Sequence, residues 1–139
     1  MEQFPNDAEL LIKANAALWN LAANSDNQIY IREKGGIECI IVSMKQFPNN
    51  PVLLTQANGA LWNLAANSDN QTYIREKGGI ECIIASMKQF PNNDELFTKA
   101  NDALTNLAVD KLNKKKILQL DANLSLKSSR KSFRMIMNL

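Results

Sequence analysis

The chain has 139 residues, of which 45% are hydrophobic and 22% charged, and these fractions are typical of a globular domain. It contains no histidine, no glycine-rich phosphate loop and only two cysteines, so the sequence predicts neither an enzyme nor a bound metal or other cofactor. No run of eighteen apolar residues is present, and acidic residues stand where a signal peptide would be basic and then apolar. We therefore expect a cytoplasmic protein, with the nucleus as the second location, and no membrane partner.

The first predicted helix covers about residues 7–23 and follows a phenylalanine-proline pair. It contains the start of the stretch ALWNLAANSDNQ, which occupies residues 17–28. No complete helix precedes it in this sequence. Leu10 and Leu11 are therefore expected to face water or another molecule.

Two shorter helices are predicted next. Ser25 and Gln28 have the spacing of a capping box, which predicts a helix over about residues 26–34. A pair of glycines then ends it, because glycine accepts the left-handed conformation found after a helix. The following helix covers residues 37–47 and stops at a proline.

The whole pattern then returns with a period of 43 residues. Asn50 is the expected cap and Pro51 the first-turn residue of a helix that continues to about Ala66, and ALWNLAANSDNQ reappears at residues 60–71. A period of this size is typical of helical solenoids, whose units bury their apolar faces only by stacking on one another. Most other repeated side chains are expected in the core or between units, Cys39 and Cys82 among them. Four charged ones are expected on a solvated face: Arg32, Glu33, Arg75 and Glu76.

The third copy loses the pattern after Leu107. Residues 1–110 have a net charge of −5, whereas residues 111–139 hold eight Lys or Arg against one acidic residue. A first helix and a last amphipathic helix over about residues 126–138 are predicted in this segment. We expect it to be a divergent C-terminal cap, with a basic tail that is disordered or dependent on a partner as the second interpretation.

Taken together, these motifs resemble the armadillo repeat. The resemblance rests on REKGGIECII, a Pro-Asn corner and a long helix that ends ALWNLAAN. The wording is closer to catenin-like than to importin-like repeats, because the importin tryptophan positions hold Ala16, Gly59 and Asp102. The resemblance implies an all-α, right-handed α-solenoid (α-α superhelix) with three helices per 43-residue unit. Residues 1–110 would be armadillo repeats, with a leading third helix at 6–24 and full units at about 25–66 and 68–109, and residues 111–139 a divergent basic C-terminal unit or cap.

One asparagine recurs near the end of each third helix. Its amide can pair with both the N–H and the C=O of a peptide backbone. It should point outward, because a buried stripe is predicted on the other side of the helix, formed by Leu54, Ala57, Leu61 and Leu64. The resemblance implies that an extended peptide binds along this row. The expected peptide-binding residues are Asn20, Asn63, Asn106, Trp19 and Trp62, with Lys13, Gln56 and Lys99 as further polar contacts.

Each of these assignments has an alternative. The asparagines could instead bond neighbouring backbone and stabilise the stack. The tryptophans could pack between third helices rather than line a groove. The resemblance favours asparagines that face a ligand, whereas both interpretations of the tryptophans stay open.

The favoured function is a protein-protein interaction scaffold that binds an extended peptide segment of a partner protein along the concave third-helix surface. A self-associating module, forming a homo-oligomer through uncapped repeat ends, or a fragment of a longer array is the first alternative. The second is nucleic-acid or anionic-surface binding, although nucleic acid is the less favoured partner. The basic residues that would serve it are Lys111, Lys114, Lys115, Lys116, Lys127, Arg130, Lys131 and Arg134.

Overall fold

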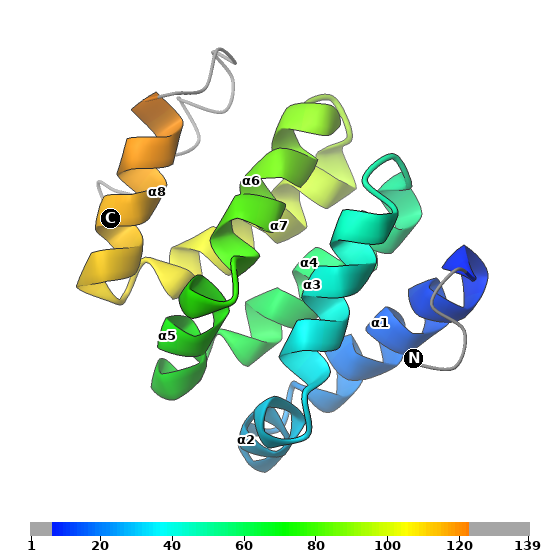
Figure 1. Cartoon of the computed structure of the whole chain (residues 1–139), viewed down its shortest axis with the longest axis horizontal. Coiled ribbons are helices and arrows are strands. Elements are labelled where there is room, and N and C mark those ends of the chain that lie inside the picture. The colour runs from blue at the N-terminus through cyan, green and yellow to red at the C-terminus, as the bar shows by residue number, and fades with distance from the viewer. Residues whose placement is uncertain (1–6, 123–139) are drawn as a thin grey trace.

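The computed structural model describes residues 7–122, and every regular element in that range is a helix (Figure 1). The helices are α1 (Ala8–Leu21), α2 (Ser25–Glu33), α3 (Gly36–Gln46), α4 (Pro51–Leu64), α5 (Ser68–Glu76), α6 (Gly79–Gln89), α7 (Asp94–Leu107) and α8 (Lys111–Ala122). Over this range none of them is both long and apolar enough to cross a membrane. The helix expected at residues 126–138 lies outside the described residues. The fold of the described chain is all-α.

Equivalent helices of successive copies lie side by side. α1 packs on α4, and α4 packs on α7, so that these three form one layer. In Figure 1, α3 and α6 lie in front of this layer and pack on α4 and α7. The short helices continue the pattern along one end, where α2 contacts α5 and α5 contacts α8. The first unit is thus repeated in space as well as in sequence.

Asparagine or aspartate caps determine where most of the helices begin. Asp7 caps α1 and Asn50 caps α4, each accepting a hydrogen bond from a backbone N–H in the first turn. The capping box expected at Ser25 and Gln28 is wrong. Asn24 is the cap of α2 and accepts from two backbone N–H groups, whereas Gln28 donates to the carbonyl of Ala22 at 2.8 Å. The buried side chain of Gln28 therefore bonds to the end of α1 and does not cap α2.

The glycine pairs at the α2–α3 and α5–α6 junctions allow a sharp reversal of the chain. Gly35 and Gly78 have φ values of 84° and 86°, as expected for residues in the left-handed conformation. Gly36 is needed for a different reason, because a Cβ there would lie 2.4 Å from Cγ2 of Ile31. Both glycines of a pair are therefore required, one for its backbone angle and one for space.

The core follows the predicted stripe. Leu54, Ala57, Leu61 and Leu64 are all buried between α4 and its neighbours. Leu11 is buried as well, which contradicts the expectation that it faces solvent, whereas Leu10 is exposed as predicted. Cys82 is buried, and this burial raises the pKa of its thiol. Cys39, expected in the core too, is only half-buried.

The repeated arginines bind the next copy instead of facing solvent, contrary to expectation. Nη1 of Arg32 donates to Oδ1 of Asn70 at 2.8 Å and to Oδ1 of Asn67 at 3.3 Å. One copy further, Nη1 of Arg75 lies 3.0 Å from Oδ1 of both Asp110 and Asn113. Charge-assisted hydrogen bonds of this kind are about twice as strong as neutral ones. Each arginine therefore links its own short helix to the N-terminus of the equivalent helix in the next copy, α2 to α5 and α5 to α8.

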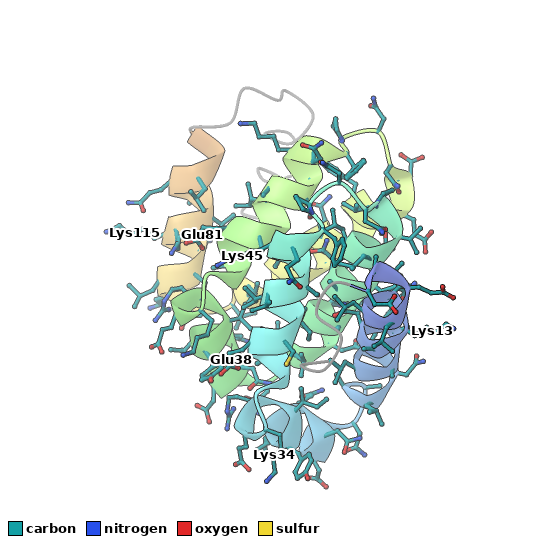
Figure 2. The ribbon with its side chains drawn as sticks, turned by 45° about the vertical axis from the view of Figure 1, so that its right-hand side comes forward. Lys13, Lys34, Glu38, Lys45, Glu81 and Lys115 are labelled. Carbon is teal, nitrogen blue, oxygen red and sulfur yellow. The ribbon has the colours of Figure 1, made fainter. Side chains whose placement is uncertain are left out.

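A second contact joins the copies near the start of α3 and of α6, where Figure 2 labels Glu38 and Glu81. Oη of Tyr73 donates to Oε2 of Glu38 at 2.6 Å. At the next junction Lys116 replaces the tyrosine, and its Nζ lies 3.0 Å from Oε2 of Glu81. The divergent third copy thus keeps the geometry of the contact and exchanges a hydrogen bond for an ion pair.

The pKa of Tyr73 is raised above its ordinary value, chiefly by the hydrogen bond to the Glu38 carboxylate and then by desolvation. A raised folded-state pKa stabilises the fold below the ordinary pKa of tyrosine, and this stabilisation is lost as the pH rises through the raised value. We expect Tyr73 to ionise late in an ultraviolet titration of Tyr30→Phe, in which it is the one tyrosine left. Adding Glu38→Gln should lower its pKa toward the ordinary value. Identical titration curves for the two variants would contradict this assignment.

Candidate functional site

The candidate site is the surface formed by α1, α4 and α7, hereafter the third-helix surface. Each of these helices contributes one asparagine of the predicted row. Asn20 on α1 is exposed, and Asn63 and Asn106 are half-buried. Because equivalent helices lie side by side, the three amides occupy equivalent positions on consecutive helices.

Two of the three amides link neighbouring copies. Nδ2 of Asn63 donates to the carbonyl of Trp19 at 2.8 Å, and Nδ2 of Asn106 donates to the carbonyl of Trp62 at 2.9 Å. This bond uses one of the two amide N–H groups. Oδ1 and the second N–H form no hydrogen bond within residues 7–122. The bond thus fixes the orientation of the amide and leaves part of its hydrogen-bonding capacity open.

The side chain of Asn20 has no such bond within the described chain. Asn20 is the first asparagine of the row. No helix of residues 7–122 supplies it with a carbonyl in the way that Trp19 supplies one to Asn63. Among residues 7–122, no group donates to or accepts from the Asn20 amide, and its side chain is exposed. It differs in this respect from the other two.

Trp19 packs between third helices and remains half-exposed. Its ring lies over Gly59 of α4, where a Cβ would fall 2.6 Å from Cδ2 of the indole. Gly59 therefore makes room for the ring. Trp62 is also half-exposed, and at the position equivalent to Gly59 the next copy holds Asp102. The rings thus bury part of their area between helices and present the rest on the third-helix surface.

Lys99 of α7 joins the two tryptophans. Its Nζ lies 4.8 Å from the centroid of the Trp19 ring and 5.2 Å from that of the Trp62 ring. Both distances are within the range of cation–π attraction. The side chain of one lysine thus reaches rings from α1 and α4, so that all three helices contribute to one polar and aromatic surface. Sequence reasoning had placed Lys99 on this face but had not paired it with the rings.

A second row of asparagines lies inside the array and was missed from the sequence. Asn15 and Asn58 are fully buried, and Nδ2 of each donates to a serine hydroxyl, that of Ser43 at 3.1 Å and that of Ser86 at 3.0 Å. These bonds connect the third helices to α3 and α6. The signal was present, because both the asparagine and the serine recur with the period. Recurrence alone cannot tell an inward row from an outward one.

Two other features lie away from the third-helix surface. A cavity of about 280 Å³ between α3 and α6 is lined in part by Cys82 and Ala85. Of the basic residues considered for nucleic acid, Lys111, Lys114 and Lys115 are exposed on α8, and Figure 2 shows Lys115 pointing away from the array. Lys116 is paired with Glu81. The remaining four, Lys127, Arg130, Lys131 and Arg134, lie outside the described residues.

In the part of the chain that the structure describes, no three His, Cys, Asp or Glu side chains are grouped to hold a metal ion. Comparison of the chain with protein-family models, curated proteins and solved structures finds no match.

Proposed function

We propose that the chain is an armadillo-like α-solenoid that acts as a protein-protein interaction scaffold and binds an extended segment of a partner across the third-helix surface. The solenoid assignment is supported by the packing of equivalent helices and by the equivalent arginine contacts at both junctions. The same 43-residue period that predicts stacking also gives one asparagine of the row to each of α1, α4 and α7.

The spacing of the three asparagines suits an extended peptide backbone. Adjacent helices pack roughly 8 to 10 Å apart and an extended peptide advances about 3.3 Å per residue, so consecutive asparagines meet main-chain groups two to three residues apart. Asn63 and Asn106 each offer an amide oxygen and one N–H, in an orientation fixed by the bond to the preceding copy. This preorganised amide is the observation that carries the proposal, because less side-chain entropy is lost when a ligand binds.

The surface around the three asparagines carries charges of both signs and also apolar area. Lys13 is paired with Glu9 at 3.5 Å, and Lys99 is held over the two indoles. Neither ammonium group is therefore an isolated charge that would demand an acidic ligand. The exposed parts of Trp19 and Trp62 offer apolar contact for alternate side chains of the peptide. A peptide segment with both polar and apolar side chains fits this surface best.

The test uses Asn20, whose replacement removes no hydrogen bond of the described chain. Peptides selected against the wild-type chain from a random library should bind Asn20→Ala about five- to tenfold more weakly, which corresponds to one or two lost hydrogen bonds. The melting temperature should not change. Asn92→Ala, at an exposed asparagine outside the surface, is the matched control and should bind as the wild type does.

Two outcomes would overturn the proposal. One is equal affinity of the wild type and Asn20→Ala for every selected peptide. The other is binding that falls steeply with salt and disappears when the exposed lysines of α8 are changed to glutamate, which would favour an anionic ligand. These lysines are Lys111, Lys114 and Lys115.

A further inference from the structure

The outward stripe of the third helices changes its charge at α7. At about 100° per residue, the positions four, seven and eleven residues before each asparagine of the row lie within about 40° of it, so the four side chains form one stripe along the helix. The stripe of α1 holds one acidic and one basic residue, that of α4 holds neither, and that of α7 holds two acidic residues and one basic. Besides the asparagine, the stripes consist of Glu9, Lys13 and Ala16 on α1, Val52, Gln56 and Gly59 on α4, and Glu95, Lys99 and Asp102 on α7.

The acidic residues of the α7 stripe differ in their partners from the one on α1. On α1 the acidic and the basic residue of the stripe are four positions apart and form an ion pair at 3.5 Å. Glu95 and Lys99 repeat this spacing. Nζ of Lys99, however, lies over the rings of Trp19 and Trp62. Within residues 7–122, the carboxylates of Glu95 and Asp102 form neither an ion pair nor a side-chain hydrogen bond.

Asp102 stands where the second copy has Gly59. A Cβ at Gly59 would lie 2.6 Å from Cδ2 of Trp19, so this position is directly beneath the indole of the preceding copy. α7 packs on α4 as α4 packs on α1, and the asparagine bonds across the two junctions are equivalent. By this equivalence we place the carboxylate of Asp102 beside the ring of Trp62. Both side chains are half-exposed and therefore within reach of a ligand.

A carboxylate beside an aromatic ring is suited to a basic side chain. Arginine fits both parts, since its planar guanidinium donates two parallel hydrogen bonds to a carboxylate and stacks on an aromatic face. Lysine offers the charge and the cation–π attraction without the paired bonds. A ligand carboxylate over α7 would instead meet two negative charges, and the ammonium group of Lys99 is already bound by the indoles. An acidic ligand residue is therefore disfavoured at this place.

We propose that the segment bound at the third-helix surface carries an arginine or lysine over α7, whose side chain forms an ion pair with Asp102 and stacks on the exposed part of Trp62. This inference rests on the peptide-binding function proposed above and names the ligand residue that the surface selects. Because consecutive asparagines meet main-chain groups about two to three residues apart, the basic residue should lie about that far from the ligand residue bonded to Asn63. The stripe of α4 carries no charge, so uncharged side chains should bind there.

The test uses peptides selected from a random library against the full wild-type chain. A basic residue should recur at one position, and replacing it with norleucine should weaken binding at least about fivefold, because a charge-assisted hydrogen bond is lost. With Asp102→Asn the same replacement should change the affinity by less than about twofold. Asp94→Asn removes an exposed carboxylate from the same helix outside the stripe, and this matched control should keep the full effect. Equal thermal unfolding curves would show that the variants are folded.

Reversing the charge gives a second measurement. With Asp102→Lys, peptides that carry glutamate in place of the basic residue should bind more tightly than the original peptides. The proposal is overturned if norleucine costs the same affinity in Asp102→Asn as in the wild type, or if the selected peptides share no basic residue. In both cases a lower affinity of Asn20→Ala would show that the peptides still bind at the third-helix surface. Equal affinity of Asn20→Ala and the wild type for every peptide would overturn the proposed function, and this inference with it.

Discussion

Replacing Asn70 with alanine is expected to lower the free energy of unfolding by about 3 kcal/mol, from the loss of three hydrogen bonds, two of them buried, at roughly 1 kcal/mol each. Asn70 is fully buried at the junction of the first two copies. Its Nδ2 donates to the carbonyls of Gln28 at 3.1 Å and Leu64 at 2.9 Å. Its Oδ1 accepts the 2.8 Å bond from Arg32. Alanine would remove one partner from each of these three groups, and Nη1 of Arg32 would keep only its longer bond to Asn67 at 3.3 Å.

The chain supplies a matched control for this prediction. Asn27 occupies the same position in the first copy, and its Nδ2 makes only the intra-copy bond, to the carbonyl of Leu21 at 2.9 Å. Because its side chain bonds to no other copy among residues 7–122, Asn27→Ala should cost about 1 kcal/mol or less. Urea denaturation followed by circular dichroism measures both values. Equal losses for the two variants would show that the contact between copies contributes little.

The order of the helices could be predicted from the sequence because each boundary has its own local chemistry. Asn50 with Pro51 marks the start of a third helix, and the glycine pair at 35 and 36 separates the first two helices of a unit. Such signals depend only on residues within one turn. The predicted cap of α2 is wrong because Ser25 and Asn24 are both residues that cap well, and in the structure the backbone N–H groups of Asp26 and Asn27 donate to Asn24.

Contacts between copies were harder to predict, because the sequence does not specify which helix faces cross a junction. Arg32 has the composition of a surface residue, yet its guanidinium reaches Asn67 and Asn70. The position of each partner depends on the rotation between units, which a period alone does not define. The same limit applies to Leu11, which is buried although the sequence predicted that it would face water or another molecule.

For the candidate site, the period placed the asparagines at equivalent positions of the three helices but could not show which other groups they contact. The bonds from Asn63 and Asn106 to tryptophan carbonyls need the distance between neighbouring helices. The place of Lys99 over two rings needs the side chains of three helices at once. In both cases the missing quantity is the spacing of the array. Residue types alone could not choose between a row open to a ligand and amides bonded to neighbouring backbone, and Asn63 and Asn106 each make the second kind of bond.

Gly59→Ala is expected to displace the Trp19 ring and to lower the free energy of unfolding by about 1 to 2 kcal/mol. An added Cβ would lie between 2.6 and 2.9 Å from three ring atoms, so the indole must move. Overpacking of this kind typically costs about 1 to 3 kcal/mol, and the better helix propensity of alanine offsets about 1 kcal/mol of that. The displaced ring should lose part of its contact with Lys99 and become more accessible to a soluble quencher of tryptophan fluorescence.

The same substitution should have the opposite sign when the ring is absent. In a Trp19→Ala background the space above Gly59 is empty, so Gly59→Ala should raise the free energy of unfolding by up to about 1 kcal/mol through helix propensity alone. A double-mutant cycle over these two positions therefore isolates the contact between ring and glycine. If Gly59→Ala changed stability equally in both backgrounds, the ring would not pack on Gly59 in solution. Trp19 would then be free to swing over the asparagine row, and its role on the third-helix surface would be that of a mobile ligand contact instead of a wedge between helices.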